Sequence, residues 1–256
     1  MTVLSQPPPA QAPKGLFARA WDSDVGHSFR TSPVAMAAAA VTLVIVLATV
    51  FAGLITPQNP FDSASLNLMD GFTPPGEAGA GSGMLFRLGA DSQGRDMYSA
   101  ILYGSRVSLL IATASVIFSL LLGVTLGLVA GYVGGQIEAL IMRIADIQLS
   151  FPAILVALLV FGIARGLIHP SLHEQMTFIV MTVAIGLSNW AQYARTVRAS
   201  TLVEKRKEYV DAARVIGLKA FPVMLKHVLP NVAGPVLVIA TINLALAVLE
   251  LSLIHI

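Results

Sequence analysis

The 256-residue chain has no cysteine, and only 12% of its residues are charged, about half the share in an ordinary soluble domain. The lack of cysteine excludes disulfides, thiolate metal sites and a cysteine nucleophile. A formal net charge of +2 is too small to indicate a nucleic-acid-binding protein. Apolar residues, in contrast, are abundant: 55% are hydrophobic, and the mean hydropathy is +0.77. A soluble fold could not bury so many, so the composition indicates an integral membrane protein.

Signatures of catalysis and nucleotide binding are also absent from the sequence. There is no G-x-x-x-x-G-K-[ST] phosphate loop, and the glycine-rich run 123–135 has no lysine. No H-E-x-x-H zinc motif, Ser-His-Asp set or pair of carboxylates stands out. His169 and His173 are four residues apart with Pro170 between them, which favours solvated interfacial histidines over a metal site. We predict no cofactor, no metal and no enzymatic activity.

Five apolar stretches approach or exceed the 20 or so residues that cross a bilayer, which predicts an all-α membrane fold. They cover residues 34–55, 107–137, 138–164, 176–194 and 228–249. Glycines at the end of the second stretch predict the turn into the third. Pro152 lies inside the third stretch and removes one helical hydrogen bond there. A kink near a gate and a merely tolerated proline are equally compatible with this position.

Basic residues are concentrated in two segments, and this sets the orientation. Eight of the 16 Lys and Arg residues lie between Arg195 and Lys226, and three lie in residues 1–33. Residues 56–100 carry two basic residues against five acids. The positive-inside rule then predicts a cytoplasmic N-terminal tail and a long external loop. The predicted organisation is the tail 1–33, a first transmembrane helix 34–55, the external loop 56–100, and a transmembrane domain 101–256 with a cytoplasmic loop 195–227.

Charged residues inside membrane stretches are costly, so each is expected to have a partner or a role. Arg143 and Asp146 are three residues apart and meet on one helix face, which favours an interfacial ion pair over a gate. Glu250 follows 22 uncharged residues and should face a cavity or another chain, unless the span ends before it. If Asp146 and Glu250 were coupling carboxylates, the chain would be an ion-coupled secondary transporter, which is the rival interpretation.

The cytoplasmic loop predicts a short helix from Glu208 that is stopped by Gly217 as a C-terminal cap. Asp211 and Arg214 lie on one face of this helix. A second face, at 3–4 spacing, is made mostly of small residues: Tyr209, Ala212, Ala213 and Ile216. Because small residues allow a partner to approach closely, this helix is suited to pass motion from a cytoplasmic protein to the membrane spans.

Asp211-Ala212-Ala213, then Gly217 and Leu229-Pro230, resemble the EAA-x3-G-x9-I-x-L-P signature of binding-protein-dependent ABC transporter permeases. Asp211 replaces the glutamate of that signature, and His227 replaces its isoleucine. The form K-H-V-L-P-N is similar to the dipeptide/oligopeptide/nickel branch. Segments 88–109, 131–135 and 142–152 resemble other elements of the same branch.

This resemblance implies a type I ABC importer permease fold, with five of an expected six transmembrane helices present. Family members continue after the glutamate as E-A-S-L-S-F-L-G-L-G, whereas Glu250 is followed by Leu-Ser-Leu-Ile-His-Ile. We therefore expect an incomplete sequence whose last residues, about 251–256, are not native.

The resemblance also implies a function, namely translocation of short peptides across the bacterial inner membrane, driven by ATP hydrolysis on separate subunits. Nickel chelates and glutathione-like solutes are alternative substrates. The implied partners are two ATPase subunits, a second permease and an extracytoplasmic solute-binding protein, with no nucleic acid. The residues expected at the ATPase are Glu208, Tyr209, Asp211, Ala212, Ala213 and Gly217.

Overall fold

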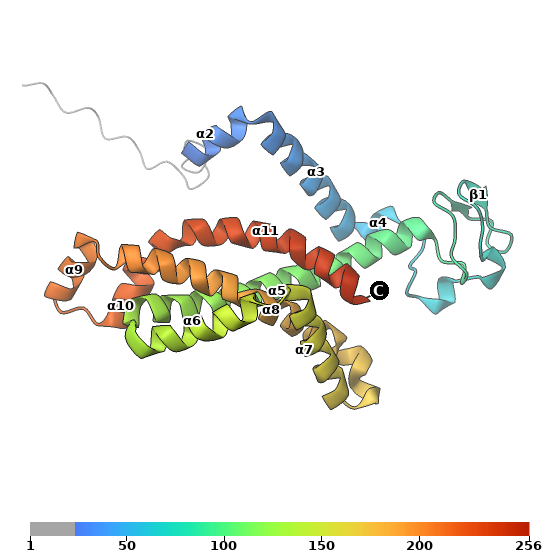
Figure 1. Cartoon of the computed structure of the whole chain (residues 1–256). Coiled ribbons are helices and arrows are strands. Elements are labelled where there is room, and N and C mark those ends of the chain that lie inside the picture. The colour runs from blue at the N-terminus through green and yellow to red at the C-terminus, as the bar shows by residue number, and fades with distance from the viewer. Residues whose placement is uncertain (1–23, 256) are drawn as a thin grey trace, which may run out of the picture. The chain divides into compact units, whose positions relative to one another are not determined.

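The computed structural model describes residues 24–255, which form two compact units that divide after Tyr103 (Figure 1). Most of the predicted N-terminal tail, residues 1–23, lies outside the described residues. The elements of the first unit are α2 (Asp24–Thr31), α3 (Pro33–Val50), α4 (Ala52–Ile55), η1 (Ser63–Ser65), η2 (Leu68–Asp70), β1 (Glu77–Ala78) and β2 (Leu85–Phe86).

Helix α3 begins where local sequence signals place it. Ser32 accepts the Ala35 N–H, and Pro33 occupies the first turn, where its missing N–H costs nothing. The 18 residues of α3 include no charge and are apolar enough to cross a membrane.

Residues 56–96 form a compact fold around a buried aspartate rather than an open loop. The Asp70 carboxylate accepts the backbone N–H groups of Gly81 at 2.6 Å and Ser82 at 3.2 Å. The Ser82 hydroxyl and these two amides lower the pKa of Asp70. Strands β1 and β2 pair antiparallel beside it, with Glu77 opposite Phe86.

The second unit begins within α5 (Met97–Val133) and is a helical bundle. Its further elements are α6 (Gly135–Leu149), α7 (Ala153–Leu167), η3 (Pro170–Leu172), α8 (His173–Glu204), α9 (Glu208–Val215), α10 (Ala220–Val223), the π-helical turn η4 (Met224–Val228) and α11 (Leu229–His255). Helices α6, α7 and α11 all pack against α8, and α9 and α10 lie together at one end of the bundle (Figure 1).

The structure revises the predicted spans. Helix α5 begins ten residues before the predicted stretch, while Gly134 and Gly135, with φ of 77° and 63°, make the predicted turn. The expected continuous helix 138–164 is wrong, because α6 and α7 meet at 97°. Pro152 lies at this bend and disfavours a helical residue before it. Among the described residues, three helices can cross a membrane, or four if α6 and α7 form one broken span; five remains a prediction.

Glycines allow α5 and α8 to pack backbone against backbone. A Cβ at Gly123 would lie 2.5 Å from the Trp190 carbonyl oxygen, and one at Gly127 would lie 2.6 Å from the Ala194 carbonyl oxygen. Gly131 is equally close to α8. Their four-residue spacing places all three on one face, as in small-residue contacts between membrane helices. The glycine-rich run without a nucleotide motif is therefore a helix-packing surface.

Candidate functional site

Helix α9 is a two-turn helix with charges that suit its dipole. Glu208 and Asp211 lie in its first turn, and Arg214 lies in its last turn. Acidic residues near the N-terminus and basic residues near the C-terminus of a helix are stabilising. An exposed ion pair at 3.3 Å also joins Asp211 to Arg214.

The end of α9 is a Schellman motif, in which a residue with positive φ turns the chain out of the helix. Gly217 has a φ of 84°. Its N–H donates to the Arg214 carbonyl at 2.9 Å, and the Leu218 N–H donates to the Ala213 carbonyl at 3.1 Å. A Cβ at Gly217 would meet no atom within 4 Å, so the backbone conformation alone favours glycine here.

One face of α9 packs into the bundle. Val210 and Ala213 are 0% and 6% exposed and belong to an apolar cluster contributed mainly by α5, α8 and α11. The other buried members are Val124, Leu128, Tyr193, Val197, Val223, Val228, Val232 and Val236. The predicted small-residue face is thus wrong, because Ala213 points inward while Ala212 is exposed.

The opposite face of α9 is open to solvent. It contains Glu208, Asp211, Ala212, Val215 and Ile216, whose spacing of three and four residues makes a continuous stripe. Val215 and Ile216 are 87% and 75% exposed. Large apolar side chains gathered on a surface commonly mark an interaction site. Val215 is not among the residues predicted for this face from the sequence. Its position seven residues after Glu208 could have indicated that both lie on the same side of the helix. We call these five residues the exposed stripe.

Tyr209 does not belong to the exposed stripe, because its hydroxyl points into the protein. It donates to Glu204 Oε2 at 2.8 Å, lies 3.3 Å from the His227 carbonyl oxygen, and accepts from Asn231 Nδ2 at 3.2 Å. Burial raises the pKa of Tyr209, and the Glu204 carboxylate adds to this. The Lys207 ammonium, 2.7 Å from Glu204 Oε1, lowers the pKa of Glu204, as does the Tyr209 hydroxyl.

Two further contacts fasten this region to the end of α5. Lys205 Nζ donates to the Gly131 carbonyl oxygen at 2.8 Å. The Arg214 guanidinium lies 5.5 Å from the centre of the Tyr132 ring, within range of a cation–π interaction. The ends of α5, α8 and α11 therefore meet around α9.

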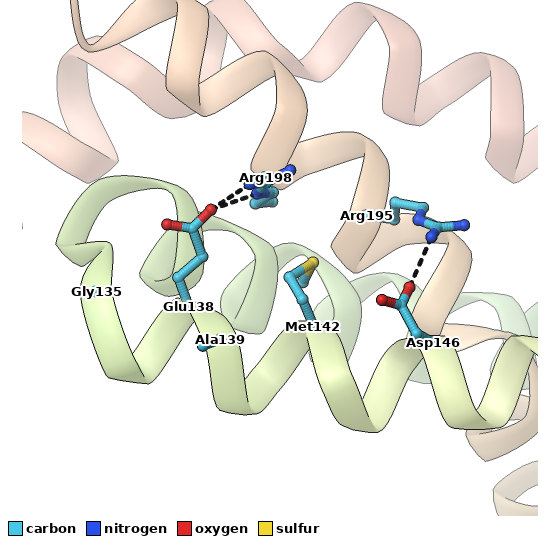
Figure 2. Close-up of a pocket in the computed structure, with 7 residues that line it drawn as sticks. All are labelled: Gly135, Glu138, Ala139, Met142, Asp146, Arg195 and Arg198. Carbon is cyan, nitrogen blue, oxygen red and sulfur yellow. Dashed lines mark hydrogen bonds and ion pairs between the residues drawn. The ribbon is translucent and has the colours of Figure 1, made fainter.

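Ion pairs tie α6 to α8 (Figure 2). Asp146 lies 2.6 Å from Arg195 Nη2, and Glu138 accepts from Arg198 Nε at 2.7 Å. The expected pair with Arg143 is wrong, because Arg195 reaches Asp146 across the helix contact while Arg143 is exposed. The four paired residues line an open hollow of about 420 Å³ together with Gly135, Ala139 and Met142.

A further contact between α6 and α8 that involves polar side chains lies near the bend at Pro152. Gln148 Nε2 donates to the carbonyl oxygens of Leu187 at 2.6 Å and Ser188 at 2.9 Å, and Trp190 Nε1 donates to Gln148 Oε1 at 2.6 Å. Of the three residues predicted as a gate or ion pair, only Asp146 joins α6 to α8 through a charged contact. Pro152 lies at the bend between α6 and α7, and Arg143 is exposed.

Two other candidates from the sequence also have nearby partners. Asn189 Nδ2 of α8 donates to Glu250 Oε2 at 3.1 Å. His169 Nδ1 lies 2.9 Å from Ser171 Oγ, and His173 Nε2 lies 2.9 Å from the Ile168 carbonyl oxygen. Within residues 24–255, no three His, Asp or Glu side chains are grouped so as to hold a metal ion.

A helical bundle with apolar spans and an exposed, glycine-capped helix between two of its long helices is the architecture of a polytopic membrane protein. Residues 123–256 match the family of binding-protein-dependent transport system inner membrane components, and residues 19–75 match the N-terminal TM domain of oligopeptide transport permease C. The chain belongs to this family of inner membrane transport components. The family and the all-α membrane fold predicted from the sequence are thereby confirmed.

Several curated relatives are similar over most of the chain. It is 34% identical over 225 residues to the di/tripeptide transport system permease protein DppC of Pseudomonas aeruginosa, covering 88% of this chain and 69% of that protein. It is 33% identical to the dipeptide transport system permease protein DppC of Escherichia coli K12, with 88% and 71% covered. The oligopeptide transport system permease protein OppC of Bacillus subtilis is 30% identical, with 86% and 66% covered. The chain thus spans about two thirds of the length of these relatives.

Proposed function

We propose that the chain is a permease subunit of an ABC importer that moves short peptides across the inner membrane. Its partners are two ATPase subunits that hydrolyse the ATP, a second permease, and an extracytoplasmic binding protein. The names of the relatives, which are di/tripeptide, dipeptide and oligopeptide permeases, support peptides over nickel chelates or glutathione-like solutes. The N-terminus and α9 are cytoplasmic, as the distribution of Lys and Arg predicts.

The proposal rests on the difference between the two faces of α9, one buried in the bundle and one exposed. Val210 and Ala213 anchor it in the bundle, and the exposed stripe leaves Ala212, Val215 and Ile216 free for a partner. The small Ala212 permits close approach, the two apolar residues supply area to bury, and Glu208 and Asp211 supply charge for recognition. A groove of an ATPase subunit is the surface that this stripe fits.

The mechanism follows from this attachment. ATP binding closes the two ATPase subunits, and α9 moves with them because its exposed stripe is docked. The bundle then opens outward towards the loaded binding protein, which the segment 56–100 meets together with the second permease. The ion-driven alternative needs Asp146 and Glu250 as coupling carboxylates, but Asp146 is paired with Arg195 and Glu250 accepts a hydrogen bond from Asn189. That alternative also leaves the exposed stripe without a role.

Single-cysteine crosslinking tests the docking directly, because the chain contains no cysteine of its own. In the assembled transporter, the Ala212→Cys variant should crosslink to an ATPase subunit. The adjacent Ala213→Cys variant should not, because Ala213 is buried in the bundle. Absence of any crosslink from the Ala212→Cys variant, with the complex intact, would contradict the proposal.

Uptake by proteoliposomes tests the substrate and the energy source. We expect ATP-dependent uptake of a labelled dipeptide that unlabelled dipeptide competes for, while glutathione and a nickel chelate do not. An ATPase partner whose phosphate-loop lysine is replaced should abolish uptake. Uptake that persists with this inactive partner and follows an imposed ion gradient would instead support a secondary transporter.

A further inference from the structure

Tyr209 lies where the proposed ATPase-docking helix joins the rest of the bundle. We infer that Tyr209, held by Glu204 and Asn231, is the joint that transmits displacement of α9 to α11, so that these three act as positioning residues. The inference rests on the proposed function. It assigns to Tyr209 a role different from contact with the ATPase, which belongs to the exposed stripe.

The Tyr209 hydroxyl connects three segments at a single point. Glu204 is the last residue of α8, His227 lies in the π-helical turn η4, and Asn231 lies in the first turn of α11. All three place a polar atom between 2.8 and 3.3 Å from the hydroxyl oxygen. The Tyr209 ring packs against the apolar cluster, and the next residue, Val210, is fully buried. Displacement of α9 therefore moves this hydroxyl and the groups bound to it together.

Glu204 makes the attachment to α8 firm. Its side chain is 12% exposed, and its two carboxylate oxygens have different partners, Lys207 Nζ at 2.7 Å and the Tyr209 hydroxyl at 2.8 Å. Hydrogen bonds to a charged group are stronger than neutral ones. Loss of the hydroxyl would leave one oxygen of a largely buried carboxylate without its partner, which is costly.

The start of α11, in contrast, departs from regular α-helical hydrogen bonding. In η4 the Leu229 N–H bonds to the Met224 carbonyl, five residues back, a geometry that is rare and occurs mostly at functional sites. Pro230 has no N–H to contribute to the ladder. Asn231 Nδ2 donates to the His227 carbonyl at 2.7 Å as well as to the Tyr209 hydroxyl. The hydroxyl of Tyr209 in α9 thus contacts the side chain of Asn231 in the first turn of α11.

The test compares transport per ATP hydrolysed in the reconstituted full transporter with its ATPase, binding protein and second permease. The Tyr209→Phe variant keeps the ring and loses the hydroxyl. We expect its peptide uptake per ATP to fall at least about threefold, as loss of a hydrogen bond to a charged group permits, while the crosslink from the Ala212→Cys variant persists. Tyr132→Phe is the matched control, because the Tyr132 ring lies beside Arg214 and its hydroxyl is outside this network; its ratio should equal that of the wild type.

Two further variants keep the inference falsifiable if Tyr209→Phe fails to fold. Asn231→Leu changes an exposed side chain and should also lower uptake per ATP. Glu204→Gln retains an oxygen that can accept from Tyr209, so it should keep more coupling than Glu204→Leu. If Tyr209→Phe and Asn231→Leu keep the wild-type ratio of peptide uptake to ATP hydrolysed, with the crosslink intact, the role of Tyr209 as a joint is contradicted while the docking of α9 stands. Loss of the crosslink in an otherwise wild-type permease would instead overturn the proposed docking.

Discussion

The contacts of α8 with α5 and α6 differ in kind from the contacts around α9. Along α5 and α6, α8 is held by glycines without room for a Cβ, by two ion pairs and by the Gln148 amide. Around α9, the contacts are the Tyr209 hydroxyl, two buried apolar residues, a π-helical turn, and the Lys205 and Arg214 contacts with the end of α5. From this difference we infer that α5, α6 and α8 pack as one body and that α9 is attached to it through fewer direct helix contacts.

The largest effect should come from breaking the contact between α5 and α8. In Gly127→Leu, the new side chain collides with the Ala194 backbone, and overpacking of this kind costs about 1–3 kcal/mol or more. Thermal unfolding in detergent should show a clear loss of stability. In the control Gly162→Leu, a Cβ meets no atom within 4 Å, so stability should hardly change. Equal midpoints for the two variants would refute the rigid contact.

The two ion pairs between α6 and α8 should differ in strength. Side chains of the Arg198–Glu138 pair are 36% and 20% exposed, against 59% and 54% for Arg195–Asp146. Glu138→Gln should therefore destabilise by about 1–2 kcal/mol, because Arg198 is left partly buried and unpaired. Asp146→Asn should cost less than about 0.5 kcal/mol, as solvent screens that pair. The same unfolding measurement checks both variants. A larger loss of stability in Asp146→Asn than in Glu138→Gln would contradict the predicted difference between the two ion pairs.

A smaller, pH-dependent effect is expected at the joint. The pKa of Glu204 is lowered from its usual 4.5, so its stabilising contribution is complete above that value and is lost as the pH falls through the lowered pKa. The pKa of Tyr209 is raised from 10.0, so its contribution is lost only at higher pH. The stability difference between wild type and Glu204→Gln should be constant near neutral pH and shrink in acid. A difference that grows in acid would show that Glu204 is not held as a carboxylate.

The most local effect should come from the helix cap of α9. In Gly217→Ala, the positive φ becomes unfavourable by about 1 kcal/mol, but no atom lies close enough to clash. Fraying should be confined to the last turn of α9, as amide hydrogen exchange can show. Bulky residues at this position should uncouple hydrolysis from transport. Unchanged exchange in α9 would argue against the capping role.

Local features of the site could be predicted from the sequence, and long-range ones could not. The Asp211–Gly217 pattern predicts a helix and its stop, because both depend on residues within a few positions of each other. Which face of α9 packs inward depends on contacts with α5, α8 and α11. Helical spacing alone therefore puts Ala213 on the same face as Ala212, whereas Ala213 is buried and Ala212 is exposed. Similarly, spacing along α6 suggested Arg143 as the partner of Asp146, but Arg195 lies 49 positions away. Pro152 predicts an interruption of the helix, but the 97° angle between α6 and α7 depends on how α7 packs on α8.

The central claim, that the exposed stripe of α9 is where the ATPase docks, is tested most directly by maleimide labelling of the Ala212→Cys variant. In the permease without its ATPase, this site should label rapidly, and the Ala213→Cys variant should label slowly. In the complete transporter, labelling of Ala212→Cys should become slow as well. Rapid labelling that is unaffected by the bound ATPase would contradict the claim.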